Sequence, residues 1–208
     1  MQIKRPMPPE NMGDPQLTAD AKAFIPALEV QAWVMANIIH EDGPVHNPDH
    51  IHLLDAPIAF LWAASGFAKK GRYVLGQAEE LTFRAGKWQK GRQEQQMVEW
   101  FGTMPSYLIT LAADYCRECT DTEFCALVEH ELYHIAQKTD AFGAPAFTEE
   151  GMPRLTMRGH DVEEFVGVVR RYGPSVEVQQ LVDAANKPAE VAHINIARAC
   201  GTCLLKLA

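Results

Sequence analysis

Apolar side chains recur at helical intervals over several stretches of the chain. In residues 18–39 they are spaced three and four residues apart, which is typical of one buried face of an α-helix. The apolar run in residues 51–67 is also interpreted as helical. Further helices are predicted at residues 120–135, 160–171 and 176–207. Helices therefore dominate the predicted structure.

Two shorter stretches have the composition of β-strands. Tyr73, Val74 and Leu75 follow a Lys-Lys-Gly turn, and residues 106–112 (SYLITLA) are apolar nearly throughout. Residues 86–96 are polar and are interpreted as a connection. We therefore predict an α+β fold, in which a sheet of two or three strands precedes the helix at residues 120–135 and packs with it and additional helices.

The chain divides into three parts. Residues 1–17 contain four prolines and a glycine, which predicts an irregular N-terminal arm. Residues 18–175 are predicted to form one domain, and residues 176–208 a C-terminal helical region. With 208 residues, 47% of them hydrophobic, the chain is long enough to bury one core.

Charge and hydropathy restrict the partners. No stretch approaches the roughly 20 uncharged apolar residues of a membrane-spanning helix, and the first residues lack the apolar segment of a secretory signal. A net charge of -8 would repel a phosphate backbone, which argues against nucleic acid as a partner. We expect a soluble protein with no membrane contact.

Four of the five cysteines form two CxxC pairs. The spacing of Cys116 with Cys119 and of Cys200 with Cys203 is one by which two thiolates share a zinc ion. A four-cysteine structural zinc site would require these distant pairs to meet. Buried free thiols in a reducing compartment are the simpler interpretation.

The best-specified helix carries a metal-binding motif. Thr120 and Glu123 form a Ser/Thr-x-x-Glu capping box at its start, and His130-Glu131-Leu132-Tyr133-His134 is an HExxH motif in its second half. Four residues advance a helix by about 400°, so the imidazoles of His130 and His134 lie one turn apart on one face. They can converge on a single zinc ion.

This arrangement predicts hydrolytic chemistry. Glu131 lies beside the two ligands, where it can act as the general base for a water molecule that zinc activates. Hydrolysis of peptide bonds in a protein or peptide substrate is the expected reaction. The alternative is a structural or regulatory protein that binds zinc without catalysis.

HExxH leaves the third protein ligand open, since catalytic zinc usually takes three protein groups. His160, Glu163 and Glu164 lie one loop beyond His134, and either glutamate could share the side of a helix with His160. Asp161 is interpreted as an acid at the start of that helix or as a partner that orients a ligand imidazole.

Three other histidines crowd a loop that also contains prolines. His46, His50 and His52 could form a second metal site, but no neighbouring residue completes it. A polar surface loop is the preferred interpretation.

Three sequence segments resemble a known family. SYLITLAAD, ALVEHELYHI and GHDVEEFVGVVRRYG, within residues 50–173, are similar to the putative phage metallopeptidase family. More distantly, a histidine followed closely by Glu-Phe resembles the SprT-like and YgjP-like zinc peptidases.

The resemblance implies a zincin-like fold, zinc-dependent proteolysis, and a phage or prophage origin. It also implies His160 as the third ligand, with Glu164 or Glu163 as the alternatives. A protein of this kind is expected in the cytoplasm of the bacterial host, with association with the virion as the other location. Neither the resemblance nor the sequence indicates an oligomeric state.

Overall fold

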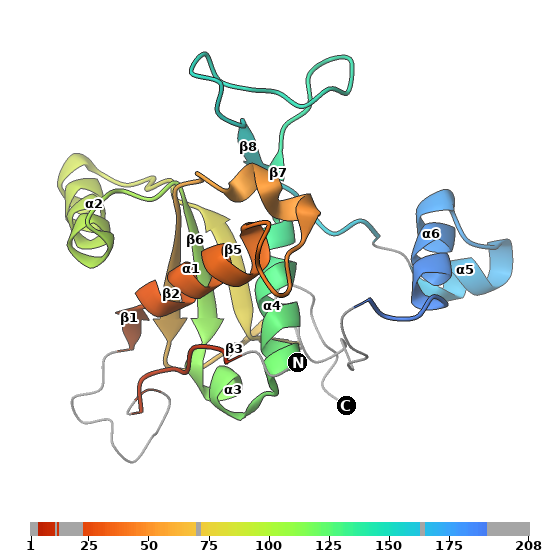
Figure 1. Ribbon diagram of the computed structural model, residues 1–208, viewed down its shortest axis with the longest axis horizontal. Helices are drawn as coiled ribbons and strands as arrows, with labels where there is room; N and C mark the ends of the chain where they lie inside the picture. The colour runs from red at the N-terminus through yellow and green to blue at the C-terminus, as the bar shows by residue number, and fades with distance from the viewer. Residues whose placement is uncertain (1–3, 11, 13–22, 70–71, 163–164, 191–208) are drawn as a thin grey trace.

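The computed structural model describes residues 4–10, 12, 23–69, 72–162 and 165–190, which form a mixed α and β structure (Figure 1). Its centre is a four-stranded sheet in the order β1-β2-β6-β5. The strands are β1 (Phe24–Pro26), β2 (Ile58–Ala63), β5 (Gly76–Glu80) and β6 (Tyr107–Ala112). Only β2 and β6 run parallel, and β5 is an edge strand antiparallel to β6.

Helices and two small hairpins accompany this sheet. The helices are α1 (Leu28–Val34), the π-helix η1 (Met35–Ile39), the 3-10 helix η2 (Pro48–Leu53), α2 (Lys87–Phe101), α3 (Ala113–Glu118), α4 (Asp121–Tyr133), α5 (Val166–Tyr172) and α6 (Val176–Ala185). Of these, α5 and α6 stand apart from the sheet in Figure 1. The hairpins pair β3 (Phe67–Lys69) with β4 (Arg72–Val74) and β7 (Ile135–Gln137) with β8 (Leu155–Met157). None of the described helices is both long and apolar enough to cross a membrane.

The main core lies on one face of the sheet. Alternate residues of β2 and β6 point to this face, where α1 packs on β2 and α4 packs beside β5. Four side chains from these elements illustrate the packing: Phe60, Trp62, Leu111 and Phe124 are buried to 2% exposure or less. This core holds α4, and with it the HExxH motif, in a fixed position against the sheet.

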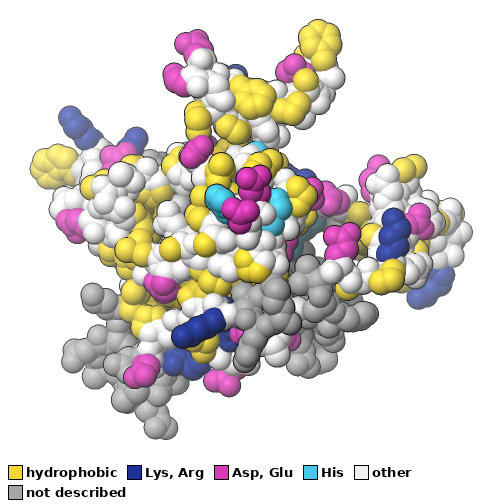
Figure 2. All heavy atoms as spheres, in the orientation of Figure 1, with side chains coloured by type: hydrophobic (Ala, Val, Ile, Leu, Met, Phe, Trp, Pro, Cys, Tyr) yellow, Lys and Arg dark blue, Asp and Glu magenta, His cyan; other side chains and the backbone are white. Residues whose placement is uncertain are grey.

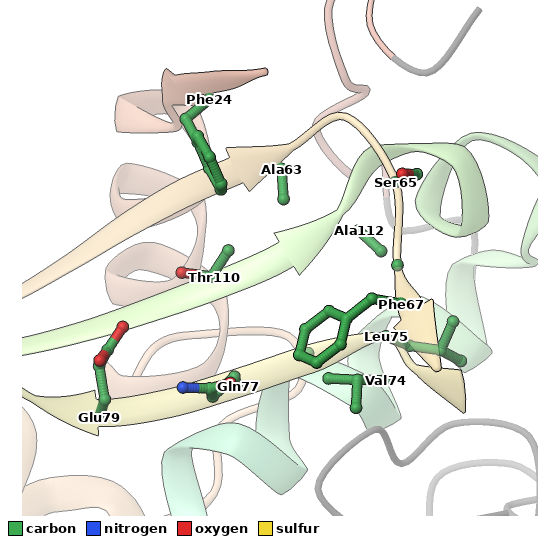
Figure 3. A pocket seen from close by; sticks show the side chains of 12 residues that line it. Phe24, Ala63, Ser65, Phe67, Val74, Leu75, Gln77, Glu79, Thr110 and Ala112 are labelled. Atoms are coloured by element: carbon green, nitrogen blue, oxygen red, sulfur yellow. The ribbon is translucent and has the colours of Figure 1, made fainter. Parts of the chain in front are cut away.

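The opposite face of the sheet is covered only in part. The last turn of α2 places Trp100 and Phe101 over Leu61 and Leu108. Beyond this contact the face opens into a pocket of about 210 Å³, into which Gln77 and other side chains of the sheet project (Figure 3). The two faces of β5 therefore have different surroundings, α4 on one side and this pocket on the other.

Several predicted elements are wrong. Residues 51–67 form η2 and then strand β2 rather than a helix, because a strand paired on both sides is apolar throughout and has no distinctive period. In the segment predicted as a connection, residues 86–96, Gly86 is the N-cap of α2 and residues 87–96 belong to that helix, which is polar because only its C-terminal end is buried. The helix predicted at residues 18–39 begins at Leu28 after β1, and the one predicted at residues 160–171 begins at Val166.

The part of the chain that connects α4 to α5 forms a long arm, which projects from the body beyond β7 and β8 (Figure 1). Residues 138–154 extend the β7–β8 hairpin as two further turns that are closed by backbone hydrogen bonds. For example, the Lys138 amide donates to the Arg154 carbonyl, and the Arg154 amide donates to the Ala146 carbonyl. Phe142 is 95% exposed, and hydrophobic side chains stand at the end of the arm in Figure 2. The loop expected between His134 and His160 is thus an extension of the β7–β8 hairpin.

Arg5 ties the described part of the N-terminal arm to the corner between α3 and α4. Its guanidinium donates to the carbonyl oxygens of Cys116 (2.5 Å) and Cys119 (2.6 Å) and to the Asp121 carboxylate (2.9 Å), and it lies 5.2 Å from the ring centre of Phe124. Arg5 itself is buried. The two carbonyls lie where α3 ends; Arg5 is their charged donor, and the Cys116 carbonyl also accepts from the Cys119 thiol at 3.7 Å.

We expect Arg5→Met to lower the free energy of unfolding by about 2–4 kcal/mol, because it leaves two buried carbonyl groups without their charged donor. Asp121→Asn should lower it by less than about 1 kcal/mol, since the Asp121 carboxylate is half exposed and its ion pair is screened by water. Urea unfolding followed by circular dichroism measures both. Equal losses for the two variants would assign the stability to the ion pair instead.

Candidate metal centre

Helix α4 presents two histidines of the HExxH motif on one face. Its start is fixed by a capping box, in which the Thr120 side chain accepts from the Glu123 amide and the Glu123 carboxylate accepts from the Thr120 amide. The core fixes its rotation, because Leu127, Val128 and Leu132 are completely buried. The positions of His130 and His134 follow from these two constraints.

The β7–β8 hairpin brings the third histidine to α4. Ile135 pairs with Met157, and the ladder continues with the Arg158 amide donating to the His134 carbonyl at 2.9 Å. His160 follows two residues later. The register of the hairpin, rather than a second helix, therefore returns the chain to the last turns of α4.

The three imidazoles converge through their Nε2 atoms. His130 Nε2 lies 3.2 Å from His134 Nε2 and 3.2 Å from His160 Nε2. Ring centres are 4.8 to 5.1 Å apart for the three pairs, and one nitrogen of each ring lies within 4.8 Å of the others. This is the arrangement of three ligands on one side of an ion.

A backbone carbonyl orients one of these rings. Nδ1 of His134 lies 2.8 Å from the carbonyl oxygen of Arg158. Because a carbonyl only accepts, Nδ1 carries the proton, and the Nε2 lone pair points toward the other two rings. His134 is buried, so water does not compete for its Nδ1 proton, and the carbonyl of Arg158 fixes the tautomer.

These residues fit a divalent transition metal ion. Neutral imidazole suits zinc, copper, iron and nickel. Two nitrogens bound to zinc at 2.0–2.1 Å with tetrahedral angles stand about 3.4 Å apart, close to the two Nε2 separations of 3.2 Å. A set of three histidines also leaves a fourth position open. The three described histidines could therefore hold one metal ion.

Glu131 lies on the sheet side of α4. Its side chain is completely buried. Its carboxylate lies against Gly76, the first residue of edge strand β5: a Cβ added to Gly76 would be 2.7 Å from Oε1 of Glu131. The acidic residue of the motif is therefore held between the helix that carries two of the histidines and the edge of the sheet.

Of the other predicted site residues, three lie within the described residues and four lie outside them. Asp161 is mostly exposed and pairs with the Arg158 guanidinium. Cys116 and Cys119 are buried and share a hydrogen bond, which raises the pKa of Cys116 and lowers that of Cys119. The remaining four predicted residues lie outside the described residues: Glu163, Glu164, Cys200 and Cys203.

The histidine-rich loop is only in part the predicted polar surface loop: Pro48 and Asp49 are exposed, but η2 contacts the outer side of α4 and buries His50, a contact that we call the η2 clamp. His50 is completely buried, with its ring centre 4.5 Å from that of Tyr133 and Nε2 3.9 Å from the Glu129 carboxylate. Asn47 donates to Glu129 at 2.8 Å, and the Tyr133 hydroxyl donates to Asp49 at 2.8 Å. Sequence reasoning missed this clamp, which only the tertiary fold assembles.

Comparison with known proteins gives one family. A family model described as "Putative phage metallopeptidase" matches residues 31–186, which include all three histidines, α4 and the arm. No curated protein and no solved structure gave a match.

We expect His160→Ala to weaken zinc binding by more than about 100-fold, a larger loss than the 10- to 100-fold typical of residues that only orient a ligand. Asp161→Ala is the matched control, and because its carboxylate is exposed it should change the affinity less than about tenfold. Competition with a chromophoric chelator measures both. A ranking in which Glu164→Gln costs more affinity than His160→Ala would move the third ligand to Glu164.

His50 predicts a pH-dependent stability. Burial, and then the nearby charge of His52, lower the pKa of His50 from 6.5 to about 4, against an opposing effect of Asp49. Below pH 6.5 the unfolded chain binds a proton at this position that the folded chain does not, so stability falls as the pH falls from 6.5 to 4, by up to about 3 kcal/mol.

Comparison of wild type with His50→Gln at each pH isolates this contribution from those of the neighbouring Glu129, Asp49 and His52. The free energy of unfolding should fall less steeply between pH 6.5 and 4 in the variant. Parallel profiles would show that His50 does not titrate in this way.

Proposed function

We propose that this chain, which belongs to the putative phage metallopeptidase family, is a zinc-dependent peptidase of the zincin type. The observation that supports the proposal best is the convergence of three imidazole Nε2 atoms at the end of a helix that also carries Glu131. The family supports a metallopeptidase. The donor set and its spacing support zinc as the metal.

His130, His134 and His160 would hold the ion. When bound, zinc supplies a Lewis acid that polarises a peptide carbonyl and lowers the pKa of a water molecule. The chain contributes the orientation of the ligands: α4 sets the first two, the β7–β8 hairpin sets the third, and the Arg158 carbonyl keeps the proton of His134 on Nδ1.

Glu131 is the proposed general base. It follows His130 directly, so its side chain leaves α4 about 100° from that of the ligand and toward the sheet. Its carboxylate would accept a proton from the attacking water and pass it to the leaving amine. The carboxylate is buried against β5 and is therefore kept away from charged groups on the surface. We propose that this favours its use as a proton acceptor at a defined position.

The edge strand β5 offers a place for an extended peptide. Leu75 accepts from the Ala112 amide and Leu81 donates to the Ser106 carbonyl, so odd-numbered residues of β5 bond to β6. Gly76, Ala78 and Glu80 therefore turn their amides and carbonyls outward. Because β5 ends the sheet and starts beside Glu131, a substrate strand added there would pass the proposed base.

The family description also supports a phage or prophage origin, and we propose a protein or peptide in the bacterial host cytoplasm as the substrate. A structural or regulatory role of the bound zinc without hydrolysis is the alternative that the following experiment separates.

Glu131→Gln should retain about one zinc per chain and lose peptide hydrolysis by at least about 100-fold, because the amide cannot accept the proton. His130→Ala should lose both zinc and hydrolysis. Metal analysis and cleavage of casein or a peptide library measure the two properties separately. The proton acceptor is missing from the first variant, and one ligand from the second.

Glu129→Gln is the control, since Glu129 precedes His130 in α4 but contacts Asn47 on the outer side of the helix. It should keep both properties. A wild-type chain that binds zinc stoichiometrically and cleaves no library would contradict the peptidase proposal and support the non-catalytic alternative.

A further inference from the structure

Strand β5 begins with a glycine at the point where it meets α4. Gly76 is buried and pairs with Leu111 of β6. Its φ angle lies outside the left-handed region that favours glycine, so the backbone does not require glycine here. The absence of a side chain must therefore have another cause.

The cause lies in the approach of Glu131. A Cβ on Gly76 would stand 2.7 Å from Oε1 and 3.1 Å from both Cδ and Cγ of Glu131. Separations of this kind are well inside van der Waals contact, so a methyl group at position 76 would require the Glu131 side chain to move from its place. The three atoms nearest to such a Cβ all belong to the Glu131 side chain.

Burial limits the positions that the Glu131 carboxylate can take. Glu131 is completely buried and belongs to α4, whose position is fixed by the core. On the other side of Gly76, the neighbouring residues Leu75 and Gln77 line the pocket on the far face of the sheet (Figure 3). At Gly76 the strand is thus a thin partition between that pocket and the Glu131 side chain.

We propose that Gly76 is a positioning residue for Glu131: the missing side chain at the start of β5 provides the space in which the carboxylate lies. The catalytic meaning of this inference rests on the proposed function, because it places the general base relative to the metal centre. Gly76 itself contacts no metal ligand in the interactions described.

A double-mutant cycle on the zinc-loaded chain tests the contact without any assay of activity. Gly76→Ala should lower Tm by about 3–10 °C, the effect of overpacking one methyl group in a buried site of a domain this size. In a Glu131→Ala background the same substitution should leave Tm unchanged within about 1 °C or raise it, because the obstructing side chain is gone.

Gly91→Ala is the matched control. Gly91 lies within α2, where an added Cβ meets nothing within 4 Å. Its effect on Tm should be the same in the wild-type chain and in the Glu131→Ala background. If Gly76→Ala also shifts Tm equally in both backgrounds, Gly76 does not hold Glu131 and the inference is wrong.

Zinc affinity and kinetics then test the positioning. Gly76→Ala should bind zinc within about twofold of wild type, since the three histidines are untouched, while kcat falls about 100-fold, as displacement of a reacting group by about 1 Å can cause. KM should change little. Coupling in Tm together with an unchanged kcat would overturn the positioning role.

The two proposals fail in different ways. If the wild type binds zinc and hydrolyses nothing, the peptidase proposal is wrong, whereas the Tm cycle still decides whether Gly76 makes the space for Glu131. If Gly76→Ala alone does not fold, recovery of a folded chain by the added Glu131→Ala supports the contact. Failure of the double variant to fold as well counts against it.

Discussion

The burial of one face of α4 is the constraint on which the rest of the described structure depends. Its apolar side chains fix the rotation of the helix against the sheet, and rotation decides where every other residue of the HExxH motif points. Two histidines are then directed to one side, Glu131 to the edge strand, and Tyr133 with Glu129 to the η2 clamp. A helix with a less complete apolar face would leave these directions undetermined.

The sequence was sufficient for the local part of this arrangement. The capping box and the motif spacing are properties of consecutive residues, so the start of α4 and the common face of His130 and His134 could be predicted. The general class of mixed α and β structure could be predicted too. His160 required more, because its approach depends on the register of β7 with β8, and only the family resemblance indicated that residue in place of a nearby glutamate.

Long-range packing explains most of what the sequence could not predict. Strand β2 is buried between two neighbours and has no helical or strand period, and α2 is polar because only its end is covered. The residues around His50 in the sequence are those of an exposed polar loop, so its burial could not be predicted from them. The burial results from contact with α4. Gly76 is the extreme case: its role is defined by a side chain that it lacks and by a neighbour far along the chain.

The projecting arm, residues 138–154, is separate from the strand pairing that positions His160. Since β7 and β8 close its base and set the return to His160, a change in the length or chemistry of residues 138–154 does not require the three histidines to move. Each doubling of such a closed loop costs only about 0.6 kcal/mol in chain entropy. The fold therefore permits insertion and deletion at the periphery of the site while the geometry of the three histidines stays constant.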